Sequence, residues 1–248
     1  MPLRPAETVL VADFPTDPDQ RVQLLSLVEE HGLLCADPGA SVAIGGEYLM
    51  MIESTLGRFA SEVARVHSVP LDGVTHTGPA GRVLNSDEPG GAASIVEPLG
   101  VVGPRSIATV IQNGEVGDRD LGVRVADAGV GPRAGGPVNP YGHMTRRELV
   151  EVLRDGLDRV LERGDSPVLQ QGAPVFANLQ MSGPNVCGFR DWAAIHVGDR
   201  HWDLAVASRD IVRVCGPNGL AVFFESYGHD LVDPIRLDWY SLAVELLS

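Results

Sequence analysis

The chain has 248 residues, of which 44% are hydrophobic and 21% charged, so it can bury a core as a soluble globular protein of one large domain or two small lobes. Its formal net charge of -14 at pH 7 argues against nucleic acid or anionic membranes as partners, because both require clustered cations. The start carries no apolar run of signal-peptide length, and nothing later approaches the roughly 18 apolar residues of a membrane span, so we expect a cytoplasmic protein.

The basic residues and the cysteines limit the available chemistry. All 19 basic residues are Arg, so no mechanism in this chain can use a lysine. Cys35, Cys187 and Cys215 stand alone, without the CxxC or CxxH spacing of a metal site. We therefore expect neither a disulfide framework nor a zinc site.

A strand and a helix are predicted near the start of the chain. The β-branched run at residues 8–13, TVLVAD, predicts the strand. The helix begins with Pro18 at its first position, with Asp17 as its N-cap and Gly32 after its end. The residues expected along its apolar face are Val22, Leu25 and Val28.

A glycine pair divides the next segment. Gly45 and Gly46 lie between two apolar runs in SVAIGGEYLMMI, which is typical of a two-residue hairpin turn. Residues 54–67 then carry apolar side chains at helical spacing. We therefore expect a reduced N-terminal lobe of strand, helix and hairpin at residues 1–52, followed by a C-terminal lobe at residues 53–248.

The stretch at residues 71–142 has a different character. It is dense in Gly and Pro, and it contains only two short strand-like runs, at residues 106–112 and 121–126. The sequence assigns no architecture to it.

Regular patterns return at Thr145. Its hydroxyl and Glu148, three residues on, predict a capping box at the start of a helix that ends at Gly164. The residues expected to face inward are Leu149, Val152, Leu153, Leu157, Val160 and Leu161.

The remaining elements follow in quick succession. A short strand at residues 168–169 precedes a loop, and the hairpin NLQM-SGPN-VCGF comes next. Three helices complete the chain, at residues 203–214, 220–227 and 234–247. A small strand-rich start followed by a mostly helical body predicts the α+β class, with two unequal lobes.

Two polar residues flank the predicted hairpin. Asn178 comes at the start of its first strand and Asp191 follows its second, so antiparallel pairing places both at the same end. Carboxylate and amide oxygens are hard ligands that suit Mg²⁺. Any hairpin has polar residues at its ends, so this pattern alone is also consistent with an ordinary solvated turn.

The spacing of these residues resembles the aminoglycoside phosphotransferase family. That family has a loop His-Gly-Asp-x-x-x-x-Asn, then a hairpin, then an Asp followed by Trp or Cys. Here Gln171-Gly172-Ala173 stands in the His-Gly-Asp place, Asn178 follows five residues after Ala173, and Asp191 follows 13 residues after Asn178. The segment VGDRHWDLAVASRDI resembles the family's Asp-rich turn and helix. The resemblance implies a protein-kinase-like fold with two lobes, an α+β architecture and metal ligands at Asn178 and Asp191.

Several parts of the family's chemistry have no counterpart in this chain. Ala173 replaces the catalytic Asp and can accept no proton. In the strand that should carry the phosphate-binding lysine, the residue is Asp13, or Ala12 in a register shifted by one. Arg21 lies near the place of the glutamate that pairs with that lysine, and the given sequence has too few residues before Thr8 for the glycine-rich hairpin, which we expect to be missing. The resemblance therefore implies a shortened N-lobe and a degenerate catalytic loop.

The neighbouring polar and aromatic residues are expected to have structural roles. Asp199 is interpreted as a turn carboxylate and Asp203 as a helix-opening carboxylate, both of which cap backbone N–H groups, with metal ligation as the alternative. His196 and His201 are interpreted as surface or packing residues, with a substitute base as the alternative. Gln171 is expected to hydrogen-bond the loop backbone. The residues expected in the core are Trp192 and Trp202.

Two functions are consistent with the sequence. The first is an ATP-dependent or GTP-dependent O-phosphotransferase with Mg²⁺, acting on a small hydroxylated molecule, with its activity impaired or lost. The second is a pseudo-phosphotransferase, related to pseudokinases, that binds a small ligand or a protein partner without catalysis. Both retain the family's fold, and the lost residues favour the second with respect to activity.

Overall fold

The computed structural model describes residues 18–35, 49–72, 74, 101–112, 144–182 and 185–247. The helices are α1 (Pro18–Glu30), α2 (Leu49–His67), α3 (Pro104–Gln112), α4 (Arg146–Leu161), α5 (His201–Cys215), α6 (Gly219–Tyr227) and α7 (Pro234–Leu247). The strands are β1 (Val101–Val102), β2 (Val168–Gln170), β3 (Leu179–Ser182), β4 (Asn185–Phe189) and β5 (His196–Gly198). The predicted strand at residues 8–13, the turn at Gly45 and Gly46, and residues 121–126 lie outside the described residues.

Helix α1 begins at Pro18 as predicted, but it buries a different face. Val22 and Leu25, expected inside, are exposed, while Gln20, Leu24 and Val28 are buried. The apolar residues of α1 lie on several sides of the helix, so their spacing does not determine which face is buried. The helix ends in a left-handed Gly32 (φ 60°), and the N–H of Leu33 bonds to the carbonyl of Val28 at 2.9 Å.

Two predicted strand segments are helical. Residues 49–52, assigned to the second arm of a hairpin, form the first turn of α2, and residues 106–112 belong to α3. Short apolar runs do not distinguish a strand from a buried helix. In α3, Pro104 occupies the first helical position, where its missing N–H costs nothing. The helix expected at residues 54–67 is confirmed within α2.

Helix α4 starts as the sequence predicts. Glu148 N–H donates to the Thr145 hydroxyl at 3.3 Å, and the Thr145 N–H donates to the Glu148 carboxylate, which completes the capping box. Leu149, Leu153 and Val160 are buried. Val152 was expected inside as well, but it is exposed, because it lies beside the buried stripe and not within it.

The strands form two small sheets. In the first, the order is β1-β5-β2, with β5 parallel to β1 and antiparallel to β2. The second is the predicted β3–β4 hairpin, in which Leu179 pairs with Phe189 and Ser182 with Asn185. Between the pairs Gln180–Gly188 and Met181–Val186, the register shifts by one residue. These small sheets within a mainly helical body confirm the α+β class.

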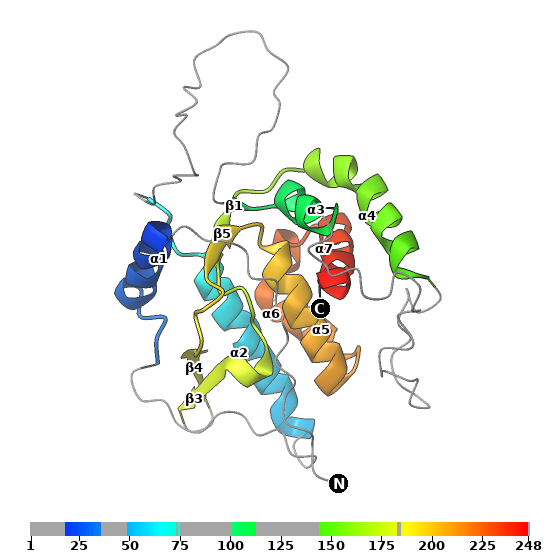
Figure 1. The fold of residues 1–248 in the computed structure, drawn as a ribbon. Helices are drawn as coiled ribbons and strands as arrows, with labels where there is room; N and C mark the ends of the chain where they lie inside the picture. Colours follow the sequence, from blue (N-terminus) through cyan, green and yellow to red (C-terminus); the bar gives the residue numbers. More distant parts are fainter. Residues whose placement is uncertain are drawn as a thin grey trace.

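Helix α5 separates two hydrophobic cores (Figure 1). Its Leu204, Ala207 and Ile211 face the core that α2 and α6 share, where the ring of Phe59 meets three other aromatic rings at 5.2–6.1 Å. On its other side, α5 packs against α7, and α3 and α4 complete that second core. Because both faces of α5 are buried, residues at its N-terminus are fixed from two directions. The tryptophans Trp192 and Trp202 are buried as predicted.

The structure corrects the expectation for the cysteines. Cys35, after α1, and Cys187, on β4, form a disulfide across 152 residues of sequence, while Cys215 is free. Local spacing could not reveal this pair, because only the fold brings the two segments together.

In the portions of the chain that the structure describes, no helix combines the length and the apolar character needed to cross a bilayer.

Candidate functional site

The loop after β2 carries the residues that resemble a catalytic loop. It runs from Gln171 to Val175 and leads into a short 3-10 helix at Phe176–Asn178. Gly172 has a φ of 87°, and a Cβ placed there would lie 2.1 Å from the Ala194 carbonyl oxygen. Only glycine fits this position, because any side chain would collide with backbone.

Asp203, on α5, holds this loop through its backbone. Its carboxylate is fully buried and accepts the N–H of Gln171 and the N–H of Gly172, each at 2.9 Å. The indole N–H of Trp202 donates to the Gly172 carbonyl at 3.2 Å. The expectation that Asp203 caps the helix that it opens is wrong, because its carboxylate accepts N–H groups of the loop and makes no cap on α5.

A chain of buried hydrogen bonds continues from Asp203 to the surface. The Nε2 atom of His67 lies 3.3 Å from the Asp203 carboxylate, and its Nδ1 atom lies 2.8 Å from the Tyr227 hydroxyl. The Tyr227 hydroxyl donates a hydrogen bond to Nδ1 of His67, and Nε2–H donates to the Asp203 carboxylate. Burial raises the pKa of Tyr227 to about 12, so the hydroxyl keeps this proton, and its oxygen is hydrogen-bonded by Arg200.

Sequence reasoning assigned no role to His67 or Tyr227. The segment FASEVARVHSVPL resembles a helix of the aminoglycoside phosphotransferase family whose end reads LARLHALP, and this resemblance is the sequence signal for His67. Tyr227 and its partner Arg200 carry no such signal, because their contact depends on how α6 packs against α2 and α5.

Gln171 joins the loop to the segment after the hairpin. Its amide nitrogen donates to the Asp191 carbonyl at 2.7 Å, and its amide oxygen accepts the N–H of Ala173 at 2.8 Å. The predicted structural role of Gln171 is therefore confirmed. A side chain that donates at one end and accepts at the other fixes both partners relative to each other.

Asn178 and Asp191 lie at the same end of the hairpin, as predicted. The N–H of Arg190 donates to the Asn178 carbonyl at 2.8 Å, directly beyond the Leu179–Phe189 pair. Asn178 uses its amide nitrogen to reach the Ala173 carbonyl at 2.9 Å, which leaves the amide oxygen on the other branch. Asp191 is exposed and adopts a left-handed φ of 58°, while its Oδ1 atom accepts the N–H of Ala193 at 3.1 Å.

Ala173 occupies the centre of this arrangement. Its N–H binds Gln171, and its carbonyl accepts both the Asn178 amide and the N–H of Val175. Its side chain is a half-buried methyl group. The backbone geometry of the loop is thus fully specified, but no acid is present where the family's loop has one.

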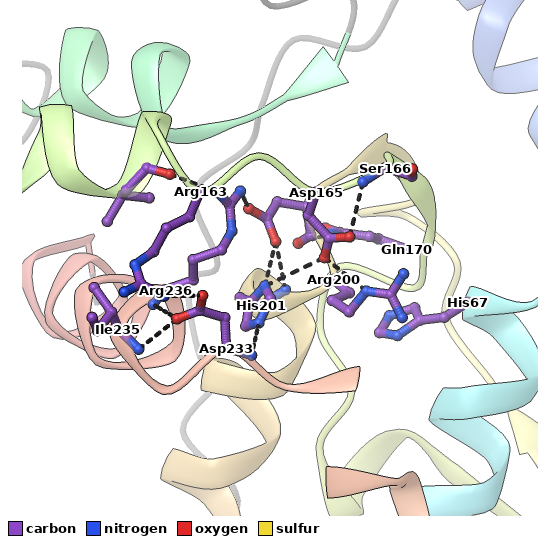
Figure 2. A network of polar contacts seen from close by, with 12 residues as sticks. His67, Arg163, Asp165, Ser166, Gln170, Arg200, His201, Asp233, Ile235 and Arg236 are labelled. Atoms are coloured by element: carbon purple, nitrogen blue, oxygen red, sulfur yellow. Dashed lines mark hydrogen bonds and ion pairs between the residues drawn. The ribbon is translucent and has the colours of Figure 1, made fainter. Parts of the chain in front are cut away.

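A second cluster of acidic and basic side chains surrounds His201 at the start of α5 (Figure 2). Three of its members, Asp165, Asp199 and His201, lie close enough to hold a metal ion. Asp165, however, is paired with Arg200 at 2.8 Å, and Asp199 is paired with the buried Arg236.

His201 is committed to protein partners as well. Its Nε2 atom accepts the N–H of Asp233 at 2.9 Å, so its Nδ1 atom carries the proton toward Asp199 at 2.7 Å. Burial lowers the pKa of His201 to about 4, which keeps the ring neutral. With two guanidinium groups beside the carboxylates and no lone pair left on His201, the cluster is an ion-pair network and a poor metal site.

The histidines and Asp199 therefore have the structural roles that were predicted. Asp199 accepts the backbone N–H of His201 at 3.0 Å. His196 and His201 are both buried packing residues and not surface ones. Burial also lowers the pKa of His196, whose Nδ1 atom lies 2.8 Å from the Ala194 carbonyl.

Comparisons with known proteins give similarity at the level of structure. No protein-family model matches the sequence, and no curated protein sequence matches it either. The solved structure of the aminoglycoside phosphotransferase APH(3'')-Id from Streptomyces rimosus, in complex with ADP and streptomycin, aligns with a TM-score of 0.57 at 16% identity. The alignment covers 98% of this chain and 84% of that one.

Two further solved structures agree with this result. An aminoglycoside-3'-phosphotransferase of type VIII aligns with a TM-score of 0.54 at 16% identity, over 92% of this chain and 78% of that one. Another structure of the Streptomyces rimosus enzyme aligns with a TM-score of 0.53, also at 16% identity, over 94% and 83% of the two chains. The chain therefore has the protein-kinase-like fold of the aminoglycoside phosphotransferases, as its loop and hairpin motifs predicted.

Proposed function

We propose that this protein binds a magnesium–nucleotide complex, Mg-ATP or Mg-GTP, together with a small hydroxylated molecule, and that phosphoryl transfer in it is impaired or lost. The observation that carries the proposal is Ala173. The hydrogen bonds of Ala173 to Gln171 and Asn178 keep the loop in a defined geometry, but its side chain offers no base. A site that keeps its scaffold and lacks its acid is suited to binding without efficient transfer.

The general base and the lysine that this chain lacks usually make large contributions to the rate of phosphoryl transfer. General-base assistance contributes about 10²- to 10⁴-fold to a rate, so its loss alone would leave a slow enzyme. The family's lysine, which neutralises nucleotide phosphates, has no replacement, since the chain contains no lysine at all. The combined losses support a proposal of impaired transfer.

Asn178 and Asp191 fit a magnesium ion by the chemistry of their donor atoms. Both offer hard oxygen atoms, which Mg²⁺ prefers, and both side chains have one branch anchored by a hydrogen bond within the protein. The ion would neutralise negative charge on nucleotide phosphates. The remaining oxygens, Oδ1 of Asn178 and Oδ2 of Asp191, are the proposed ligands.

The comparisons support the choice of ligands. One of the solved structures of the same fold is a complex with ADP and streptomycin, a nucleotide and a small molecule. In this chain the nucleotide preference and the acceptor belong to the proposal. A non-catalytic module that binds a protein partner is the alternative, and it predicts no response to nucleotide.

A thermal-shift titration tests the binding half of the proposal. Mg-ATP or Mg-GTP at 100 times its Kd is expected to stabilise the fold by about 3 kcal/mol, which raises Tm by about 5 °C. Asp191→Ala is expected to abolish this shift. Asp155→Ala, at an exposed carboxylate on α4, is the matched control and should leave the shift intact. No shift at millimolar nucleotide would exclude the magnesium–nucleotide proposal and leave the protein-binding module.

Restoring the acid tests the catalytic half. Ala173→Asp places a carboxylate on a loop whose backbone is already held, so transfer to a panel of hydroxylated amino sugars is expected to rise by about 10²-fold or more. Transfer is measured as ADP or GDP release with and without acceptor. An unmodified protein that already turns over at an ordinary enzyme rate would contradict the proposed impairment.

A further inference from the structure

The end of α1 and the strand β4 lie in direct contact. Gly188 on β4 has a φ of 154°, and a Cβ placed there would lie 2.6 Å from the Leu33 carbonyl oxygen. The disulfide lies beside this contact. It joins Cys187, the residue before Gly188, to Cys35, which follows two residues after Leu33, and its Cα–Cα distance is 5.3 Å. We refer to residues 32–35 and 185–189 together as the junction.

A β-bulge directs Cys187 into the junction. Gly188 pairs with Gln180 and Val186 pairs with Met181, so Cys187 is one extra residue between two pairs of the ladder. Such a bulge turns the strand and changes the direction of a side chain, at the cost of regular pairing. In this hairpin the redirected side chain is the one that forms the disulfide.

The junction has other contacts that do not depend on the disulfide. The Leu33 side chain is buried in the core that α2 lines, and Arg65 donates to the Gly32 carbonyl at 3.0 Å. On the hairpin side, Asn185 accepts a hydrogen bond from Arg58 of α2, and the β3–β4 pairing is made by the backbone. These contacts support a folded protein in the reduced state, with the end of α1 held less tightly.

Both cysteines are half-buried, so a reductant can approach the disulfide. A disulfide that a reductant can reach is suited to reversible reduction, because exposed disulfides are the labile ones. We propose that the Cys35–Cys187 disulfide is a reversible redox switch, which ties the end of α1 to the β3–β4 hairpin and releases it on reduction. Asn178 and Asp191 lie at the open end of the same hairpin, and Asp191 follows four residues after Cys187, so the switch acts next to the proposed metal ligands.

The exchange reaction balances with a dithiol as co-reactant. A thiolate of the dithiol attacks one sulfur of the disulfide and forms a mixed disulfide, and the second thiol of the reductant then displaces the remaining cysteine. Cys35 and Cys187 end as two thiols, and the dithiol ends as a disulfide. Oxidation by a disulfide such as oxidised glutathione reverses the change.

Hydrogen–deuterium exchange on the full chain tests the switch without any assumption about nucleotide binding. Amides of residues 31–35 and 185–189 are followed in the oxidised protein, after reduction by dithiothreitol or thioredoxin, and after reoxidation, with thiols counted at each stage. We expect at least tenfold faster exchange in both segments on reduction, unchanged exchange in α5 and α7, and recovery on reoxidation.

Three serine variants provide the controls. Cys35→Ser and Cys187→Ser should show the fast exchange whatever the redox state. Cys215→Ser should behave as the unmodified protein, because Cys215 lies on α5 outside the junction. The proposal is overturned if the junction exchanges equally in both redox states, if millimolar dithiol cannot reduce the folded protein, or if reduction accelerates exchange throughout the chain, which would make the disulfide a structural staple.

Discussion

Asp199 and Asp203 lie four residues apart at the start of α5, and both carboxylates are buried, but their donors differ. Asp203 accepts two neutral peptide N–H groups and so fixes the backbone of the loop. Asp199 is paired with the buried guanidinium of Arg236. The hydrogen-bond donors, and not the residue types, therefore distinguish the loop-positioning cluster around Asp203 from the ion-pair network around Asp199. A carboxylate whose partner is an arginine has little charge left for a metal, whereas one bound by peptide groups sets the shape of a loop.

The largest effect on stability is expected for Asp199→Asn. This change leaves the guanidinium of Arg236, which is only 4% exposed, buried without its counter-ion. Breaking a buried pair in this way costs about 3–5 kcal/mol. Denaturant unfolding monitored by circular dichroism measures the loss, and adding Arg236→Met should recover at least half of it, because no unpaired charge remains. Failure of this rescue would mean that Asp199 acts mainly through His201.

The second expected effect is the loss of stability at low pH through His201. Its folded-state pKa is lowered from 6.5 to about 4 by burial, so the unfolded chain binds a proton first as the pH falls. Stability is therefore complete above pH 6.5 and declines between pH 6.5 and about 4, by about 3 kcal/mol.

Carboxylates titrate over the same pH range. The contribution of His201 must therefore be measured as the difference in pH dependence between the unmodified protein and a variant that lacks His201. Asp165 and Asp199 face the His201 ring, and Arg200 lies beside it. We expect His201→Gln to unfold with a shallower dependence of its free energy on pH between 6.5 and 4 than the unmodified protein. Equal slopes would show that the folded and unfolded chains bind the His201 proton over the same pH range.

Asp203→Asn is expected to cost less than Asp199→Asn, because no buried cation is left behind. The side-chain oxygen of the new Asn can still accept a hydrogen bond from one of the two peptide N–H groups. Its NH₂ group faces the other N–H, and two donors cannot bond to each other. The loss of one bond to a charged acceptor amounts to about 2 kcal/mol. Arg236→Met should not rescue this variant, and that contrast separates the two carboxylates. A rescue in both backgrounds would mean that they belong to a single network.

Much of the hairpin and its neighbours could be predicted from the sequence, because the signals are local. The capping box of Thr145 and Glu148, the β3–β4 pairing and the spacing from Asn178 to Asp191 depend on residues close in sequence. The role of Gln171 followed from its place in the family's loop, whereas Asp203 was expected to cap its own helix and instead holds the loop. The hydrogen-bond partners of these side chains depend on tertiary packing and could not be predicted from the sequence.

The remaining features depend on contacts between distant segments. The disulfide joins Cys35 to Cys187 across 152 residues, and the carboxylate of Asp199 meets Arg236 across 37. No local pattern encodes such pairs. The buried face of α1 and the helical state of residues 106–112 were mispredicted for a related reason, since apolar runs fit several faces or both element types until a neighbouring element selects one.

The smallest expected effect on stability concerns Gln171, whose side chain supports the loop in addition to the Asp203 carboxylate. Gln171→Leu removes the bonds to the Ala173 N–H and the Asp191 carbonyl, but Ala173 is only half-buried, so water can replace part of what is lost. We expect a cost of about 1 kcal/mol, against about 2 for Asp203→Asn. Gln171→His keeps a donor for the Asp191 carbonyl and should be nearly neutral. If Gln171→Leu costs as much as Asp203→Asn, the side chain of Gln171 and not the Asp203 carboxylate is the main support of the loop, and the comparison between the two carboxylates loses its basis.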